Sequence, residues 1–222
     1  MNLPAPILMS LPHPALAAAM MAAAYLAGSA PFGVIVARAK GVDLRKVGSG
    51  NVGATNVARA LGKRWGCLVF LLDMLKGLLP VALAGVLLAP DRPPTPPQQG
   101  LWLGVGLAAI AGHVFSLFLG LRGGKGVATA LGVVLGIYPY FTWGGLAAFA
   151  LWIAVLLVSR YVSLASIVAA LAFGPLLVAF NLRQVGSLWP LMTFAAAVIV
   201  LILVRHRTNV RRLLAGTENR FF

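Results

Sequence analysis

Seven long apolar stretches run through this chain and constrain its fold more than any other feature. They lie at roughly 15–37, 66–89, 101–120, 125–139, 141–159, 162–181 and 188–204. A helix needs about 20 mostly apolar residues to cross a bilayer, and within lipid it satisfies its own backbone polar groups. We therefore expect an all-α, polytopic membrane protein of about seven transmembrane helices, forming one membrane-integral domain over 1–222. The fourth stretch is short and ends at Pro139, so it is also compatible with a re-entrant element.

The composition agrees with membrane insertion. Hydrophobic residues make up 60% of the chain and charged residues only 10%, whereas soluble domains carry about 25% charged residues. A net charge of +14 would suggest nucleic acid in a soluble protein. Here the basic residues lie between the apolar stretches, where the positive-inside rule explains them, and we expect no nucleic-acid partner.

The distribution of Lys and Arg predicts the orientation. If the N-terminus is outside, the outer loops contain only Arg92 and Arg183. The inner loops then contain Arg38, Lys40, Arg45, Lys46, Arg59, Lys63, Arg64, Arg122, Lys125, Arg160, Arg205, Arg207, Arg211, Arg212 and Arg220. This asymmetry predicts an outer N-terminus and a cytoplasmic C-terminus.

A first polar motif, VGSGNVGATNVAR at 47–59, follows the first apolar stretch on the predicted cytoplasmic side. Its glycines leave backbone N–H groups unobstructed, so the segment is able to fold into a nest that wraps an anion. Arg59 adds a planar guanidinium, whose fork of donors matches phosphate. The other residues that we expect to face this anion are Ser49, Gly50, Asn51, Thr55 and Asn56.

This motif has two other interpretations. A flexible glycine-rich connector is the simpler one, although linkers seldom interleave Asn, Thr and Gly so densely before an Arg. The string GSGNVG at 48–53 also matches GxGxxG. No strand precedes it and no βαβ unit can be built around it, so a dinucleotide-binding fold is rejected.

A second motif, GLRGGKGVAT at 120–129, separates the third and fourth apolar stretches. It is not a P-loop, because Gly126 follows Lys125 where that motif requires Ser or Thr. A glycine-rich loop that opens a helix still favours an anion, since free N–H groups and the helix dipole converge there. We expect a phosphate site made by Lys125 with Gly124, Gly126 and Thr129. A positive-inside lysine between glycines that only turn the chain is the alternative.

A third motif, RHRTNVRRLLAGTE at 205–218, follows the last apolar stretch. Read as a helix, it places His206, Asn209 and Leu213 on one face. Its arginines alone suit a polybasic tail attracted to anionic lipid, but that interpretation leaves His206 and Asn209 unexplained. Ser163, at the start of the sixth stretch, is equally suited to be a helix N-cap or a ligand.

Ionisable groups also lie within the predicted spans. Asp73 and Lys76 are three residues apart in the second stretch, and His113 lies in the third. Such groups usually pair inside the bundle and often mark function. No spacing of His, Cys, Asp and Glu suits a metal site, so neither a metal nor another cofactor is expected. The chain has only four acidic residues, which leaves little basis for a Ser-His-Asp triad.

Together these motifs resemble the bacterial acyl-phosphate:glycerol-3-phosphate acyltransferase family. The matching strings are GSAPFG at 28–33, GSGNVGATNVARALGK at 48–63, LLDMLKG at 71–77, GGKGVATALG at 123–132, RYVSLASI at 160–167 and RHRTNVRRLLAGTE at 205–218. The resemblance implies acyl transfer from an acyl phosphate to the 1-hydroxyl of sn-glycerol 3-phosphate, without acyl-CoA. The products would be lysophosphatidic acid and inorganic phosphate. It also implies a multi-pass protein of the bacterial plasma (inner) membrane with its active site facing the cytoplasm.

Roles for individual residues follow as hypotheses. We expect Ser49, Asn51, Thr55 and Asn56 to hold phosphoryl oxygens or the reacting carbonyl, with Arg59 as the main electrostatic partner. Lys125 would hold a phosphate, which the resemblance identifies as that of glycerol 3-phosphate. Ser163, His206 and Asn209 would close the pocket. The proton of the attacking hydroxyl would go to a substrate phosphate oxygen or to His206, whose unperturbed pKa suits a base.

Two other functions fit the same loops. A transporter of organic phosphates also uses helix N-termini to hold anions, but usually near the bilayer midplane and often with internal repeats. The candidate ligands here gather at one membrane face, and no duplicated halves are visible in the sequence. Another lipid-phosphate transferase is the second alternative.

Overall fold

The computed structural model describes residues 13–91, 93–183 and 186–222, and these contain helices but no strand. The α-helices are α1 (His13–Ser29), α2 (Phe32–Arg38), α3 (Ala54–Leu61), α4 (Lys63–Leu87), α5 (Pro96–Val114), α6 (Val127–Gly136), α7 (Thr142–Ser159), α8 (Val162–Phe180), α9 (Trp189–Arg205) and α10 (Arg207–Leu214). Two short 3-10 helices are η2 (Leu44–Lys46) and η3 (Leu117–Leu119). The expected all-α class is confirmed.

Within the part of the chain that the structure describes, five helical segments are long and apolar enough to cross a membrane, namely Pro14–Arg38, Lys63–Leu87, Pro96–Leu119, Thr142–Ser159 and Val162–Phe180. A sixth is formed if α9 and α10, which meet at a bend of 53°, count as one span. The chain is therefore a multi-pass membrane protein.

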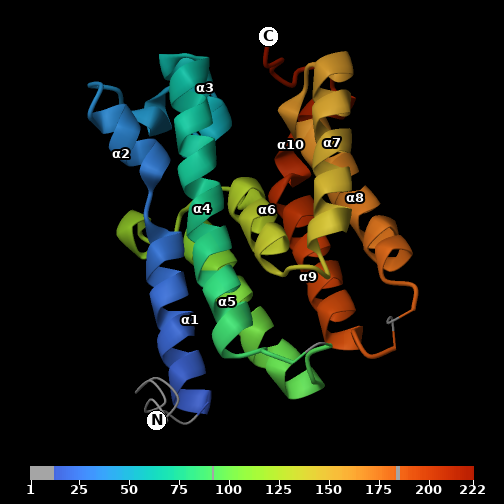
Figure 1. Cartoon of the computed structure of the whole chain (residues 1–222). Coiled ribbons are helices and arrows are strands. Elements are labelled where there is room, and N and C mark those ends of the chain that lie inside the picture. Colours follow the sequence, from blue (N-terminus) through green and yellow to red (C-terminus); the bar gives the residue numbers. More distant parts are fainter. Residues whose placement is uncertain (1–12, 92, 184–185) are drawn as a thin grey trace.

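The fourth apolar stretch does not form a full span, so the number of spans among the described residues is lower than the expected count of about seven. Its helix α6 has 10 residues, so at a rise of 1.5 Å per residue it covers about half of the hydrocarbon core. In Figure 1, α6 ends partway along the bundle, and α7 leads the chain back toward the end where the C-terminus lies. This stretch therefore matches the re-entrant alternative better than a full span.

The position of α6 is set by close packing against α4. A side chain at Gly77 would collide with the carbonyl oxygen of Thr129, and one at Gly132 would collide with that of Met74. Small residues let membrane helices approach this closely. Figure 1 shows α6 between a group formed by α1, α4 and α5 and a second group formed by α7, α8 and α9. The N-terminus of α6 is thereby held between the two groups.

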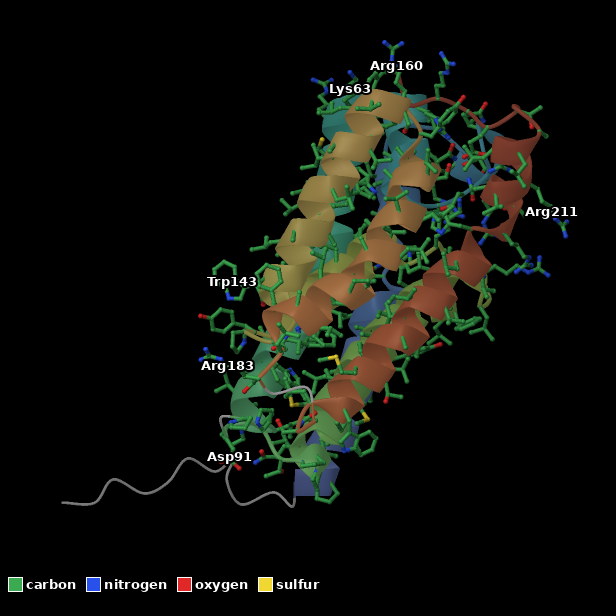
Figure 2. All side chains as sticks on the ribbon, turned by 90° about the vertical axis from the view of Figure 1, so that its right-hand side faces the viewer. Lys63, Asp91, Trp143, Arg160, Arg183 and Arg211 are labelled. Atoms are coloured by element: carbon green, nitrogen blue, oxygen red, sulfur yellow. The ribbon has the colours of Figure 1, made fainter. Side chains whose placement is uncertain are left out.

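Charged residues lie toward opposite ends of the bundle. Lys63, Arg160 and Arg211, from the predicted inner set, lie toward one end, whereas Asp91 and Arg183 lie toward the other (Figure 2). Arg92, the second member of the predicted outer set, is outside the described residues. The labelled members of the two loop sets are thus separated along the length of the molecule.

Candidate active site

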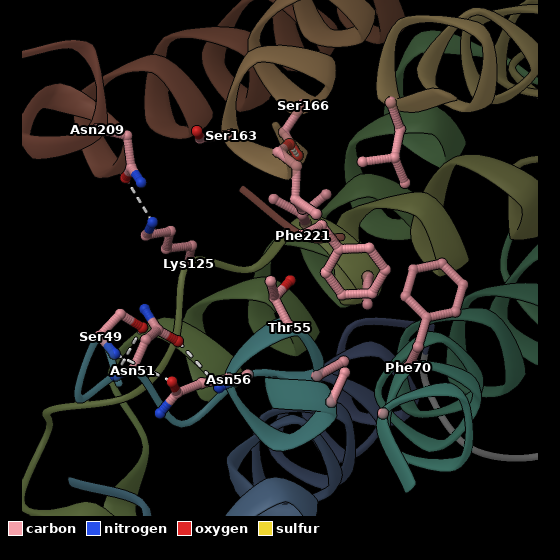
Figure 3. Close-up of a pocket in the computed structure, with 18 of the residues that line it drawn as sticks. Ser49, Asn51, Thr55, Asn56, Phe70, Lys125, Ser163, Ser166, Asn209 and Phe221 are labelled. Atoms are coloured by element: carbon pink, nitrogen blue, oxygen red, sulfur yellow. Dashed lines mark hydrogen bonds between the residues drawn. The ribbon is translucent and has the colours of Figure 1, made fainter. Parts of the chain in front are cut away.

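A cavity of about 480 Å³ lies between α3, α4, α6, α7, α8 and the C-terminal segment. It gathers residues from all three polar motifs, as Figure 3 shows for several of them. Ten of the thirteen residues predicted for the site line it, namely Ser49, Asn51, Thr55, Asn56, Arg59, Lys125, Gly126, Ser163, His206 and Asn209. Segments more than 150 positions apart in the chain therefore share one site.

The other three predicted residues lie behind the cavity wall. Gly50 turns the first loop at a φ of +68°, which favours glycine. The carbonyl oxygen of Gly124 accepts a hydrogen bond of 2.9 Å from Arg205, which holds the second loop in place. Thr129 is fully buried in the contact between α6 and α4. These residues shape the site instead of lining it.

The first loop is organised from inside by Asn56, which is 1% exposed. Its side-chain oxygen accepts the amide hydrogen of Ser49 at 3.0 Å. Its side-chain nitrogen donates to the carbonyl oxygens of Leu44 at 3.1 Å and Val47 at 2.9 Å. Since both ends of this amide are used within the loop, Asn56 positions Ser49 at the cavity.

Two backbone amides of the first loop are used within the loop itself. The amide hydrogen of Gly53 is donated to the Asn51 side chain at 2.9 Å, and that of Gly50 to the carbonyl of Val47 at 3.1 Å. The amide hydrogens of Ala54 and Thr55, at the start of α3, have no acceptor among the described residues. The amide donors left for an anion therefore include those at the N-terminus of α3, within the motif predicted from the sequence.

The N-termini of α3, α6 and α8 line this cavity. The lining includes Gly53 and Ala54 at the start of α3, Val127 at the start of α6, and Val162 and Ser163 at the start of α8. Each N-terminus carries a partial positive charge and unsatisfied amide hydrogens, which together favour anions. The cavity is thus suited to more than one phosphate group.

A glutamate that the sequence analysis did not assign, Glu218, connects the second and third motifs. Its Oε1 accepts hydrogen bonds from Ser163 at 2.8 Å and Asn209 at 2.7 Å, and its Oε2 accepts one from Arg212 at 2.6 Å. Asn209 in turn accepts a hydrogen bond from the Lys125 ammonium through its side-chain oxygen. The signal available in the sequence was an acidic residue at the end of an otherwise basic motif.

The cationic groups of the site are partly buried, and this changes their acidity. Burial lowers the pKa of Lys125 to about 8; Glu218 acts to raise it, and the guanidinium groups of Arg212, Arg59 and Arg205 lower it further. Burial also lowers the pKa of Arg59, although an arginine keeps its charge. A mobile proton on Lys125 and a permanent charge on Arg59 therefore face the same cavity.

His206, the second residue of the third motif, lies in the cavity wall and is 2% exposed. Its Nδ1 is 2.8 Å from the carbonyl oxygen of Ile202. Because a carbonyl only accepts, this contact assigns the ring proton to Nδ1 and leaves a lone pair on Nε2. The imidazole is therefore arranged as a hydrogen-bond acceptor toward the cavity.

The opposite wall of the cavity is apolar. Phe70 of α4 stacks on Phe149 of α7 with 6.2 Å between ring centroids, and Phe149 stacks on Trp152 at 5.8 Å. A second cavity of about 100 Å³, between α6, α7, α8 and α9, shares these three residues and is lined almost entirely by apolar side chains. The site thus combines a cationic end with an apolar extension between helices.

Comparison with known proteins agrees with this geometry. The family described as glycerol-3-phosphate acyltransferase matches residues 18–216. Among curated relatives, the glycerol-3-phosphate acyltransferase of Geobacter sulfurreducens is 50% identical over 204 residues, covering 91% of this chain and 96% of the relative. That of Aquifex aeolicus is 46% identical over 202 residues, with coverages of 89% and 95%.

Two solved structures have the same fold. Both are of PlsY, an integral membrane glycerol 3-phosphate acyltransferase. Its glycerol 3-phosphate form has a TM-score of 0.80 and 44% identity, covering 93% of this chain and 96% of that one. Its lysophosphatidic acid form has a TM-score of 0.77 and 42% identity, with coverages of 92% and 95%. The chain therefore belongs to the glycerol-3-phosphate acyltransferase family.

Proposed function

We propose that this protein transfers a fatty acyl group from an acyl phosphate to the 1-hydroxyl of sn-glycerol 3-phosphate, forming lysophosphatidic acid and inorganic phosphate. The proposal rests on one observation: the cavity with cationic side chains adjoins a second, apolar cavity and shares lining residues with it. Glycerol 3-phosphate is small, polar and anionic, whereas the acyl donor has an anionic head on a long apolar chain. The cationic cavity suits the anionic groups of both substrates, and the apolar extension suits the acyl chain of the donor.

An acyl phosphate donor suits the groups that line the cavity. The 1-hydroxyl oxygen attacks the acyl carbonyl carbon, the bond from that carbon to the phosphate oxygen breaks, and inorganic phosphate leaves. The hydroxyl proton passes to a phosphate oxygen of the substrate or to His206 Nε2. Because phosphate is a good leaving group, positioning and charge stabilisation supply most of the catalysis. Arg59 and the N-terminus of α3 hold the donor phosphate, and Lys125 holds the phosphate of glycerol 3-phosphate.

The location proposed for the protein is a bacterial plasma membrane. The cationic end of the cavity faces the cytoplasm, since it lies at the end that carries most of the Lys and Arg residues (Figure 2). Glycerol 3-phosphate reaches it from water, and the acyl chain reaches the apolar extension from the lipid.

The direct test uses purified protein in detergent with palmitoyl phosphate and glycerol 3-phosphate, following phosphate release and lysophosphatidic acid together. Equal amounts of both products are expected from the acyl phosphate and none from palmitoyl-CoA in a parallel reaction. Product from the thioester alone would overturn the proposed donor. Absence of product from either donor, in folded protein, would overturn the acyltransferase function and leave phosphate uptake into liposomes as the next assay.

The pKa of Lys125 predicts how glycerol 3-phosphate binding depends on pH. Below pH 8 the ammonium is charged and attracts the phosphate, whose own second ionisation is complete above about pH 7. As the pH rises through about 8, the free enzyme loses this charge, so KM for glycerol 3-phosphate is expected to rise about tenfold per pH unit. Steady-state kinetics from pH 6.5 to 9.5 measure this rise. Lys125→Arg, which stays charged, moves the rise out of this range, and a flat profile for the native enzyme would contradict the assignment.

The apolar extension predicts a dependence on acyl chain length. Ala170 lines the second cavity, which has a volume of about 100 Å³, so Ala170→Phe would fill it. Each methylene that is no longer buried costs about 0.8 kcal/mol, and the preference for palmitoyl over decanoyl phosphate is expected to fall about tenfold or more. Competition assays with the two donors measure this ratio. The matched control is Ala179→Phe, at an exposed position of the same helix; an equal effect there would refute the assignment of the second cavity.

A further inference from the structure

A buried pair of residues, Asp73 of α4 and His113 of α5, also lines the main cavity and has no role in the reaction described above. Asp73 is 2% exposed and His113 is 7% exposed. The Lys76 ammonium lies 2.8 Å from Asp73 Oδ1 and donates to the carbonyl oxygen of Ala30 at 2.7 Å. Asp73 is thus a neutralised carboxylate held at a fixed place beside the imidazole.

The orientation of the His113 ring follows from this carboxylate. Its Nδ1 lies 3.7 Å from Asp73 Oδ1, and no hydrogen-bond partner for Nδ1 is present among the described residues. A carboxylate accepts hydrogen bonds and does not donate them, so the ring proton is favoured on Nδ1. The lone pair of the imidazole is then on Nε2, at the other edge of the ring.

The backbone of the second loop packs beside this Nε2 atom. The amide hydrogen of Gly124 is donated to the carbonyl oxygen of His113 at 3.1 Å, which brings the loop against the end of α5. A Cβ atom on Gly124 would collide with Nε2. Glycine at this position therefore keeps the lone pair free of a side chain, next to the residue that precedes Lys125.

Most polar groups of the cavity are donors suited to phosphate, including Arg59, Lys125 and the helix N-termini. A neutral imidazole that presents a lone pair is suited instead to a hydroxyl group, which has a proton to donate. Glycerol 3-phosphate has two hydroxyls on carbons adjoining or near its phosphate ester. Lys125 and His113 line the same cavity, so a glycerol 3-phosphate whose phosphate is at Lys125 would have its hydroxyls on the side of the cavity available to His113.

The two hydroxyls are distinguished by the walls of the cavity. The 1-hydroxyl has to meet the acyl carbonyl, so it faces the apolar wall made by Phe149 and Trp152 of α7. His113 belongs to α5, on the side of the cavity that packs with α1 and α4 (Figure 1). We propose that His113, oriented by Asp73, accepts a hydrogen bond from the 2-hydroxyl of glycerol 3-phosphate and so selects this acceptor. The inference rests on the function proposed above and adds a specificity-determining residue to it.

The test compares glycerol 3-phosphate with 3-hydroxypropyl phosphate, which retains the reacting hydroxyl and the phosphate but lacks the 2-hydroxyl. The native enzyme is expected to have a kcat/KM about tenfold higher for glycerol 3-phosphate. The analogue cannot donate a hydrogen bond from a 2-hydroxyl, and it leaves the buried acceptor of His113 unsatisfied. Equal use of the two acceptors by the native enzyme would overturn the inference without any variant. No reaction with glycerol 3-phosphate itself would be a failure of the proposed function instead.

Two substitutions test whether His113 causes this preference for glycerol 3-phosphate. His113→Phe is expected to remove the preference for glycerol 3-phosphate, and His113→Gln to restore part of it by placing an amide oxygen near the position of Nε2. The control is Gln99→Leu, another buried polar residue of α5, which donates to Pro94 and Ser187 away from the cavity. It is expected to lower thermal stability and leave the preference unchanged. A loss of kcat in His113→Phe with the preference intact would overturn recognition of the 2-hydroxyl.

Discussion

Arg59→Ala is expected to lower kcat/KM for acyl transfer by about 10²- to 10³-fold, which is the range measured when one preorganised donor to a developing charge is removed. The guanidinium lines the cavity and donates from Nη2 to the carbonyl oxygen of Asn219 at 3.0 Å. Its Nε is buried and has no hydrogen-bond partner among the described residues. A donor held in place and left unpaired is preorganised for an anionic ligand. Phosphate release from palmitoyl phosphate with saturating glycerol 3-phosphate measures the effect.

Two further variants separate charge from geometry at this position. Arg59→Lys keeps the charge but loses the planar fork, so it is expected to recover only part of the activity. Arg64→Ala removes an exposed arginine that lies over the Trp65 ring at 5.7 Å and does not line the cavity. Its activity is expected to stay within about twofold of the native enzyme, because exposed charges contribute little. A comparable loss in both alanine variants would show that Arg59 acts only through net charge.

Glu218→Gln is expected to lower kcat/KM about 10- to 100-fold and to lower the melting temperature by several degrees. The carboxylate accepts hydrogen bonds from Ser163, Asn209 and Arg212. Burial acts to raise its pKa, but these three hydrogen bonds outweigh burial and lower the pKa. Glutamine has the same size but only one accepting oxygen and no charge, so one donor loses its partner and Asn209 is no longer fixed beside Lys125.

Activity and thermal unfolding of the same preparation measure both effects of Glu218→Gln. The matched control is Asp43→Asn, at an exposed acidic residue whose ion pair with Lys46 spans 3.7 Å. Asparagine keeps the acceptor that Asp43 provides to the amide of Arg45, so little change is expected. If Glu218→Gln retained full activity and stability, the hydrogen-bond network would have no role in assembling the site.

The fold class and most of the residues that line the cavity could be predicted without the structure. The length and apolar content of the stretches required helices in lipid, because this requirement depends only on local composition. The polar motifs were recognisable for the same reason, since glycines, short polar side chains and basic residues occur together in each segment. Ten of the thirteen predicted residues consequently line the cavity.

The contacts between these segments could not be predicted, because they depend on packing between helices that are distant in the chain. Lys125 and Asn209 are 84 positions apart, and Ser163 and Glu218 are 55 apart, so no local pattern reveals that they share one hydrogen-bond network. The shortness of the fourth apolar stretch allowed a re-entrant element, but an apolar stretch does not specify where its helix ends, so only the structure shows that α6 has 10 residues. The same limit applies to Asp73 and His113, because the direction of a side chain within a bundle is set by packing between helices.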